Sequence, residues 1–236
     1  QGVSSAASDV YKRQGMDIGM SDDDLTNKIM ETIDANQMHS DIHLRLIVSR
    51  GLKRTPYQHP KANIGGPSIV IIPEHKIVTE ESKSKGLELV SVNTIRSSQL
   101  TQDPKINSLS KFNCIQACIE ADRLGADEGL MLDMNGYVST CNSTNFFIVR
   151  HSEVWTSTGE YCLNGVTRGS IIHLCKKNNI NFVYPGEIDL RQKTKSNIFL
   201  KIEGKPVLIT LARLEKRKGL NHLLLSLIHI SEPTRL

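Results

Sequence analysis

Apolar residues recur at helical spacing in three segments of the chain, which predicts three helices. These segments are residues 21–36, 108–125 and 166–179. The first begins with Ser21 and an acidic turn, a common helix start, and the second closes on Gly125, a common helix end. The faces expected to be buried consist of Leu25, Ile29, Met30 and Ile33 in the first helix and Phe112, Ile115 and Ile119 in the second.

Alternating or short apolar runs predict strands around these helices. The predicted strands are residues 42–51, 68–73, 87–96, 128–133, 137–140, 145–149 and 153–157. Residues 68–73 are almost entirely apolar, as in a strand buried on both faces. Asn135 and Gly136 favour a tight turn, so the strands on either side are expected to form a hairpin. The pattern predicts a mixed α/β (α+β) fold.

Both ends of the chain resemble translated sequencing-adapter DNA. One adapter strand encodes DVYKRQ, residues 9–14, and its reverse complement encodes LSLIHI, residues 225–230. We therefore expect residues 1–14 and 225–236 to be adapter-like tails and exclude them from the fold. Because the natural N-terminus is not visible, the sequence leaves open whether the protein has a targeting segment.

Composition argues against several functions. The net charge of +4 is carried partly by the tail-like ends, so nucleic-acid binding is not implied. No apolar run approaches the roughly 20 residues that cross a bilayer, so no membrane partner is expected. The five cysteines lack zinc-ligand spacing, which favours reduced thiols. We therefore expect an intracellular, cytoplasmic enzyme, with organelle targeting left open.

The segment LGADEGLMLDMNGYVSTCNSTNFFIV, residues 124–149, is followed by LNGVTR, residues 163–168. Together they resemble the class IV, fold-type IV pyridoxal 5'-phosphate (PLP) aminotransferases, the family of branched-chain and D-amino-acid aminotransferases. The resemblance covers about residues 21–181. It implies a truncated fold of two subdomains with mixed sheets, residues 15–100 and 101–182. It also implies PLP as cofactor, an amino acid and a 2-oxo acid as substrates, and a homodimer when intact.

Within this resemblance, Lys105 is our first choice for the lysine that carries PLP, because a proline holds its segment extended. Lys111, inside the predicted helix, is the alternative. Gly165, Val166 and Thr167 are the phosphate-contacting positions, where a helix N-terminus offers free N–H groups and a positive dipole end. The family's N-terminal portion and a later Gly-Thr loop are missing, so the fragment is expected to bind PLP poorly.

Thr140 stands where relatives carry a glutamate beside the pyridine nitrogen. A hydroxyl keeps that nitrogen protonated less strongly than a carboxylate does, which puts full transamination in doubt. Arg45 matches the substrate-carboxylate anchor of the branched-chain enzymes, and Arg50 matches that of the D-amino-acid enzymes. Five residues apart on a strand, the two point to opposite faces, so we expect only one to serve.

Residues 183–224 resemble the start of the second domain of retaining GT-B glycosyltransferases. The resemblance is carried by Arg213, Leu214, Lys218 and Gly219, a motif whose basic pair contacts a sugar-nucleotide diphosphate. A chimeric junction near residues 182–186 is the expected origin. The favoured function is PLP-dependent transamination. The alternatives are an aminodeoxychorismate lyase-like elimination, glycosyltransferase activity of the C-terminal segment, and a catalytically silent PLP-fold module.

Overall fold

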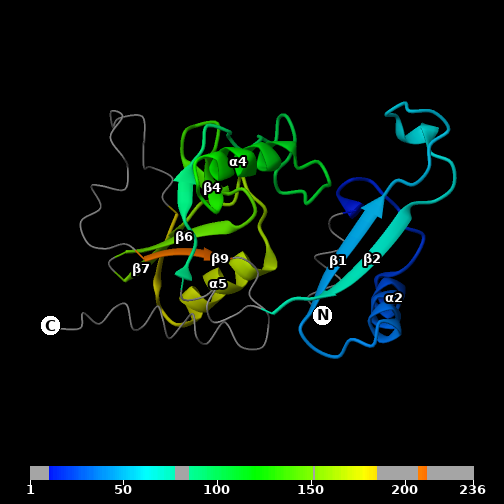
Figure 1. Ribbon diagram of the computed structural model, residues 1–236, viewed down its shortest axis with the longest axis horizontal. Helices are drawn as coiled ribbons and strands as arrows, with labels where there is room; N and C mark the ends of the chain where they lie inside the picture. The colour runs from blue at the N-terminus through cyan, green and yellow to red at the C-terminus, as the bar shows by residue number, and fades with distance from the viewer. Residues whose placement is uncertain (1–10, 78–84, 151, 185–206, 212–236) are drawn as a thin grey trace. The chain divides into compact units, whose positions relative to one another are not determined.

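The computed structural model of the 236-residue chain describes residues 11–77, 85–150, 152–184 and 207–211. It divides into two compact units, residues 1–86 and 87–236 (Figure 1). No helix in the described ranges is long and apolar enough to cross a membrane.

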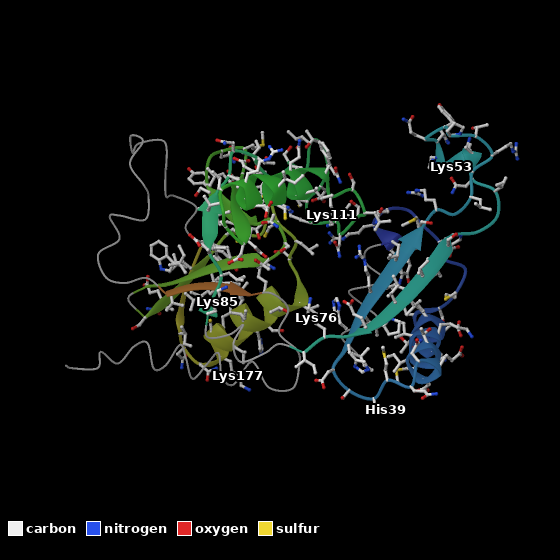
Figure 2. All side chains as sticks on the ribbon, viewed as in Figure 1. His39, Lys53, Lys76, Lys85, Lys111 and Lys177 are labelled. Atoms are coloured by element: carbon white, nitrogen blue, oxygen red, sulfur yellow. The ribbon has the colours of Figure 1, made fainter. Side chains whose placement is uncertain are left out.

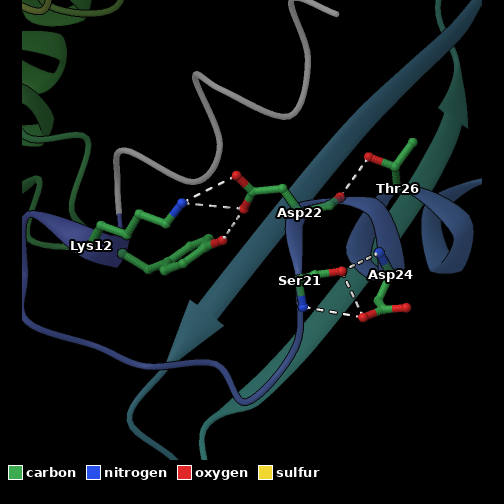
Figure 3. Close-up of polar contacts among 6 residues, drawn as sticks. Lys12, Ser21, Asp22, Asp24 and Thr26 are labelled. Carbon is green, nitrogen blue, oxygen red and sulfur yellow. Dashed lines mark hydrogen bonds and ion pairs between the residues drawn. The ribbon is translucent and has the colours of Figure 1, made fainter.

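The first unit, in its described part, has a two-stranded antiparallel sheet that packs on helix α2. Its elements are α2 (Asp22–Ala35), β1 (Ile42–Ser49), the 3-10 helix η1 (Pro60–Ala62) and β2 (Ser68–His75). Ser21 caps α2 as expected: its Oγ accepts the Asp24 N–H at 3.1 Å, and the Asp24 carboxylate accepts the Ser21 N–H at 3.2 Å (Figure 3). This reciprocal capping explains why the helix begins where the sequence predicts.

One face of this sheet packs on α2, and the other face does not. Leu25 and Ile29 are buried as predicted, but Met30 is 52% exposed. The prediction that residues 68–73 are buried on both faces is wrong, because Val70 and Ile72 are 47% and 42% exposed. A single helix covers only the side chains that alternate toward it. The prediction counted apolar residues without knowing how many layers would cover them.

Tyr11 belongs to the core of this unit although it lies in the predicted adapter-like tail. Its side chain is 2% exposed and packs with Leu25 and Ile29. The Tyr11 hydroxyl donates to the Asp22 carboxylate at 2.9 Å, and Lys12 forms an ion pair with the same carboxylate at 3.1 Å (Figure 3). Residues 11 and 12 therefore contact α2 directly, while the adapter-like origin of residues 1–14 stays a prediction.

In its described residues, the second unit contains two sheets and two helices. Its elements are β3 (Leu89–Ser91), α4 (Phe112–Arg123), β4 (Glu128–Leu132), β5 (Val138–Cys141), β6 (Asn145–Arg150), β7 (Glu153–Thr156), α5 (Val166–Lys177), β8 (Asn181–Val183) and β9 (Val207–Leu211). One sheet has the order β3-β4-β5 and the other β8-β7-β6-β9. The predicted hairpin is confirmed as antiparallel β4 and β5, and the second predicted strand pair as β6 and β7. The mixed α/β class is therefore confirmed.

Helix α4 presents a different face to its sheet than the apolar spacing predicts. Its buried residues are Ala117 and Ala121, whereas the predicted core residues Phe112, Ile115 and Ile119 are 70%, 54% and 46% exposed. The reason is the close approach of the helix to β4. A Cβ added at Gly129 would lie 2.9 Å from the carbonyl oxygen of Ala117. Only small residues allow this spacing, so the larger side chains face outward.

Strand β9 comes from the segment predicted to resemble a glycosyltransferase. It pairs antiparallel with β6 at the edge of the four-stranded sheet. The proposed diphosphate-contacting positions, Arg213, Leu214, Lys218 and Gly219, lie outside the described residues. At the N-terminal end of the second unit, β3 pairs in parallel with β4. Strand β3 therefore belongs to the second unit, and the boundary between the units lies between Gly86 and Leu87.

Candidate functional site

The N-terminus of α5 has the geometry of an anion-binding site. The helix begins at Val166, as predicted, and Gly165 precedes it with φ −50° and ψ 158°. No side chain in the described residues caps this end, so Thr167 is not a capping residue. The first-turn N–H groups have no intrahelical acceptor and lie at the positive end of the helix dipole. They can therefore bind an anion such as a phosphate group.

Arg168 braces the loop that leads into α5. The residue is 5% exposed, and its guanidinium donates to Asn164 Oδ1 at 2.8 Å and to the carbonyl oxygen of Ser157. Gly159 lies in the same loop with φ +87°, and a Cβ there would overlap the Asn164 side chain. The loop is thus folded tightly onto the first turn of the helix. Arg168 ends the LNGVTR motif, which is the only sequence signal that could have indicated this role.

Thr140 lies on β5 and is 5% exposed. Its Oγ1 donates to the carbonyl oxygen of Thr144 at 2.6 Å. Glu128 holds the same turn, because its carboxylate accepts hydrogen bonds from the hydroxyls of Ser143 and Thr144. The Thr140 hydroxyl hydrogen is already used, so toward any further group its oxygen can act only as an acceptor.

Cys141 follows Thr140 and lies inside this network. Burial, together with the nearby charge of Glu128, raises the pKa of the Cys141 thiol to about 12. The thiol therefore stays protonated at neutral pH and behaves as a small apolar side chain.

Lys111 occupies the N-cap position of α4, directly before Phe112 (Figure 2). Its side chain makes no capping hydrogen bond. It was expected inside the helix. Its side chain is half-buried, and Nζ donates to Asn107 Oδ1 at 2.8 Å. Burial lowers the pKa of the Lys111 ammonium; the charge of Arg96 lowers it further, and that of Cys114 opposes the shift. Lys111 therefore has the half-buried, less basic amine that favours a reactive lysine.

Lys105 lies in a turn and not in the extended segment that the sequence predicts. The N–H of Ile106 donates to the carbonyl oxygen of Asp103 at 3.2 Å, which closes the turn. The backbone N–H of Lys105 donates to Asp103 Oδ1 at 3.0 Å, and its ammonium makes no hydrogen bond to a described residue. Pro104 is at the second position of this turn, where proline is favoured.

Arg96 joins the elements that carry these residues. Its side chain is 8% exposed; Nε donates to the carbonyl oxygen of Tyr161 at 3.3 Å, and Nη1 donates to Cys114 Sγ at 2.7 Å. The Tyr161 carbonyl also accepts the Ser139 hydroxyl at 3.0 Å. The start of α4, strand β5 and the loop before α5 are thus connected within the second unit. Sequence reasoning missed Arg96 and Tyr161, and no local pattern marks either.

The two predicted anchor arginines lie in the first unit. Arg45 alternates with Leu44 and Leu46, which pack on α2, so it lies exposed on the opposite face of the sheet. It makes no hydrogen bond to a described residue. Arg50 follows the end of β1, and its guanidinium donates to the carbonyl oxygen of Gln14. Arg50 lies beyond Ser49, the last residue of β1, so the prediction that the two arginines point to opposite faces of one strand stays a prediction.

Comparison with known proteins identifies the family. The family model described as amino-transferase class IV matches residues 9–200. The chain belongs to the class IV aminotransferases. The match includes strands β4 to β7, among them the strand that carries Thr140, and helix α5, which Gly165 precedes.

Curated relatives of this class IV aminotransferase include branched-chain-amino-acid aminotransferase-like protein 2 of Arabidopsis thaliana, 34% identical over 157 residues, which are 66% of this chain and 28% of the relative. A putative branched-chain-amino-acid aminotransferase of Methanocaldococcus jannaschii is 29% identical over 178 residues, 74% of this chain and 59% of the relative. The chain therefore spans less than two thirds of the length of these relatives.

Solved structures confirm the fold of the class IV aminotransferases for this chain. The branched-chain amino acid aminotransferase of Thermobaculum terrenum, solved in its PLP form, matches with a TM-score of 0.66 at 18% identity, over 77% of this chain and 59% of that one. The branched-chain enzyme of Escherichia coli matches with a TM-score of 0.67 at 22% identity, over 77% of this chain and 58% of that one. The predicted fold-type IV aminotransferase fold is confirmed.

Proposed function

We propose that this chain is part of a PLP-dependent enzyme that transfers the amino group of a branched-chain amino acid to a 2-oxo acid. The observation that carries the proposal is the uncapped N-terminus of α5, whose first-turn N–H groups can bind a phosphate, in the unit that also contains the half-buried Lys111. The names of the curated relatives favour transamination over lyase, glycosyltransferase and silent-module functions.

The residues of the second unit fit PLP at its phosphate end. The N–H groups of Val166 and Thr167 would hold the phosphate. Gly165 leaves the approach open, since a Cβ there would meet only Asn145 Nδ2 at 3.7 Å. Thr140 Oγ1 would accept a hydrogen bond from the ring nitrogen, because its own hydrogen is donated to Thr144. When bound, PLP supplies an electron-withdrawing ring that stabilises negative charge at the substrate Cα.

We infer that Lys111 carries the cofactor, with Lys105 as the alternative. The lowered pKa of the Lys111 amine, which burial causes, supports this choice, and Arg96 connects Cys114 of the same helix to the loop before α5. An amine of lowered pKa is unprotonated in a larger fraction of molecules at neutral pH. Lys111 Nζ could then take a proton from the substrate Cα and return it, as a general base and acid.

Arg45 is the proposed anchor for the substrate carboxylate. Its guanidinium is exposed and makes no hydrogen bond to a described residue, so both arms of its fork could bind the two carboxylate oxygens. The guanidinium of Arg50 already donates to Gln14. Because Arg45 is the position that resembles the branched-chain enzymes, this difference favours a branched-chain substrate over a D-amino acid.

We also propose that the intact protein is an intracellular homodimer. The five cysteines are free, as expected for a reducing compartment. The outward row on α4 formed by Phe112, Ile115 and Ile119 is an apolar surface suited to burial against a second copy. In light scattering, Ile115→Lys should shift the intact protein toward monomer, whereas the exposed substitution Lys177→Glu should not. An unchanged dimer in Ile115→Lys would contradict the use of this surface.

The cofactor assignment is tested by reducing the chain with borohydride in the presence of PLP and locating the modified lysine by mass spectrometry. We expect Lys111 to be modified above the exposed Lys177, and excess inorganic phosphate to suppress this modification. Lys111→Ala should abolish the selective label, whereas Lys105→Ala should retain it. Preferential labelling of Lys105, or equal labelling of all three lysines, would contradict the proposal.

The substrate is tested on the chain extended by the regions that its relatives possess. L-leucine, L-valine and D-alanine are compared as amino donors by steady-state kinetics. We expect the first two to react, and Arg45→Met to raise their KM more than Arg50→Met does. Preference for D-alanine, with KM sensitive to Arg50, would support the D-amino-acid alternative.

A further inference from the structure

Asn145 lies on the face of β6 that packs on α5. Phe147 and Val149, two and four residues further along the strand, are buried in one cluster with Ile171 of the helix. Side chains alternate along a strand, so the side chain at residue 145 belongs to the same face. Its amide Nδ2 lies 3.7 Å from the point where a Cβ on Gly165 would stand. The alternation of β6 therefore brings an uncharged donor to the residue that precedes α5.

A buried thiol sets the orientation of this amide. The Cys162 thiol donates to Asn145 Oδ1, with 3.8 Å between the sulfur and the oxygen, and Cys162 is 1% exposed. A thiol carries a single hydrogen, so its other neighbour, the Ser157 hydroxyl at 3.6 Å, donates to the sulfur. This chain of donors keeps Oδ1 on the thiol side of the amide and turns Nδ2 toward Gly165.

The N–H groups of the Asn145 amide are left for a further acceptor. Within the described chain, the amide makes its one hydrogen bond through Oδ1. Gly165 has no side chain to fill the space beside Nδ2, and no described side chain caps the first turn of α5. The amide of the strand and the uncapped start of the helix therefore meet at Gly165.

The charge at this end of α5 favours an anion. Arg168 is 5% exposed, and its guanidinium donates to two neutral groups, the Asn164 side chain and the Ser157 carbonyl. Arg168 Nε is buried and has no hydrogen-bond partner among the described residues. A buried cation that pairs with no described carboxylate is costly unless an anion lies nearby. Because Arg168 is in the first turn, its charge adds to the positive end of the helix dipole.

We propose that Asn145 is a further anion-binding residue of this site, and that its Nδ2 donates to a phosphate oxygen held by the N–H groups of Val166 and Thr167. The ligand class is a phosphate monoester, whose three terminal oxygens can accept from the strand and the helix at once. Cys162 is a positioning residue that acts through the amide. The inference rests on the proposed function, because the phosphate is that of the cofactor.

The probe is inorganic phosphate, titrated into the full chain without cofactor and followed by heteronuclear NMR. The backbone N–H signals of Val166 and Thr167 report on the helix start, and the side-chain NH2 signals of Asn145 report on the proposed contact. We expect these signals to shift together, with one dissociation constant. A shift at Val166 and Thr167 that leaves the Asn145 NH2 signals unmoved would overturn the inference and retain the helix site.

Asn145→Asp separates a contact with phosphate from a structural role. The aspartate keeps the oxygen that accepts the Cys162 thiol but places a negative oxygen where Nδ2 was, so phosphate affinity should fall at least about tenfold. Asn142→Asp is the matched control, because Asn142 Oδ1 accepts the Gly129 N–H at 2.7 Å and an aspartate preserves that bond. Its charge, at the β5–β6 turn, is screened by salt and should change the affinity less than about twofold. Equal losses in the two variants would contradict the proposal.

The orientation of the amide is tested at Cys162. Cys162→Ala removes the donor to Asn145 and should weaken phosphate binding about threefold, whereas Cys162→Ser keeps a donor and should retain the affinity. Cys175→Ala also removes a thiol that is 1% exposed, from the core between α5 and its sheet, and should leave the affinity unchanged. Denaturant unfolding of each variant gives the folded fraction by which its affinity is corrected. Wild-type affinity in folded Cys162→Ala would overturn the role of the thiol.

Failure of the proposed function would look different from failure of this inference. If phosphate shifts the signals of Asn145, Val166 and Thr167 but borohydride traps PLP on no lysine, the cofactor assignment fails and the anion site with Asn145 stands. If phosphate shifts none of these signals, the inference fails together with the phosphate end of the proposed function.

Discussion

Thr140 and Thr144 are joined by a hydrogen bond that fixes the role of the Thr140 oxygen. The Thr140 hydroxyl donates to the Thr144 carbonyl at 2.6 Å within a buried turn. The Glu128 carboxylate accepts a hydrogen bond from the Thr144 hydroxyl in the same turn. From the sequence, a glutamate is expected at this position in relatives. Here the Thr140 oxygen can accept a hydrogen bond, but it carries no negative charge.

Removing the Thr140 hydroxyl should affect stability and cofactor capture together. Thr140→Val preserves shape but removes one of two donors to the Thr144 carbonyl, which still accepts the Cys141 N–H at 3.0 Å, so it should cost about 0.5–1.5 kcal/mol in the free energy of unfolding. Thr140→Ser keeps the donor and should cost less. Denaturant unfolding measures the first effect, and borohydride trapping of PLP measures the second. Equal stability of the Val and Ser variants would show that the bond contributes nothing.

Adding a methyl group at Gly159, in the loop before α5, should lower the stability of the fold more than the same change at Gly125. Gly159→Ala requires a strained φ and also overlaps Asn164, whereas Gly125→Ala has φ +78° and open space around its Cβ. The control should lose about 1 kcal/mol from strain alone, and Gly159→Ala should lose about 1–3 kcal/mol more from overpacking.

Gly159→Ala should also weaken phosphate competition in the trapping assay, because Asn164 and Arg168 shape the turn at Gly165. Gly125→Ala, placed after α4, should leave this competition unchanged. If both variants bind phosphate as the wild type does, the loop does not support the anion site.

Stability should fall in acid partly because of Glu120. Hydrogen bonds, first from the Asn93 backbone, lower the pKa of the Glu120 carboxyl below its ordinary value of 4.5. A lowered pKa in the folded state stabilises the fold above the unfolded pKa, and this contribution is lost as the pH falls through the folded value. Glu120→Gln should therefore weaken the fold near neutral pH and flatten its acid dependence below pH 4.5. Asp122→Asn, on the exposed side of the same helix, is the control in thermal melts.

Tyr11 should contribute to the first unit until strongly alkaline pH. Burial, then the hydrogen bond and charge of Asp22, raises the pKa of the Tyr11 hydroxyl to about 12. A raised pKa stabilises the fold below the unfolded value of 10.0, and that contribution is lost as the pH rises through about 12. Tyr11→Phe should remove this alkaline dependence, which is measured by fluorescence-detected unfolding.

Tyr11→Ala should cost about 3 kcal/mol, because it empties a buried aromatic position. The same comparison examines the adapter-like tail. A chain that begins at residue 15 should lose as much stability as Tyr11→Ala if residues 11 and 12 belong to the fold. No loss in either chain would mean that the tail is dispensable.

The sequence by itself determined the elements and the family. The Ser21 cap and the Asn135-Gly136 turn depend on contacts within a few residues. The helical and alternating spacings of apolar residues are also local patterns. Helices α2 and α5 and the β4–β5 hairpin therefore lie where they were predicted. The motif that ends at Arg168 likewise marked the start of α5 without any knowledge of tertiary contacts.

Tertiary structure alone decided which faces are buried and which lysine has a special environment. The helix face with Phe112 is exposed because β4 approaches so closely that only alanines fit between them. Local sequence favours Lys105 over Lys111. Only folding brings Arg96 to Tyr161, 65 positions away, and only folding buries Lys111, which is the largest cause of the lowered pKa of its amine. Burial and electrostatics depend on partners distant in sequence, and local pattern carries no record of them.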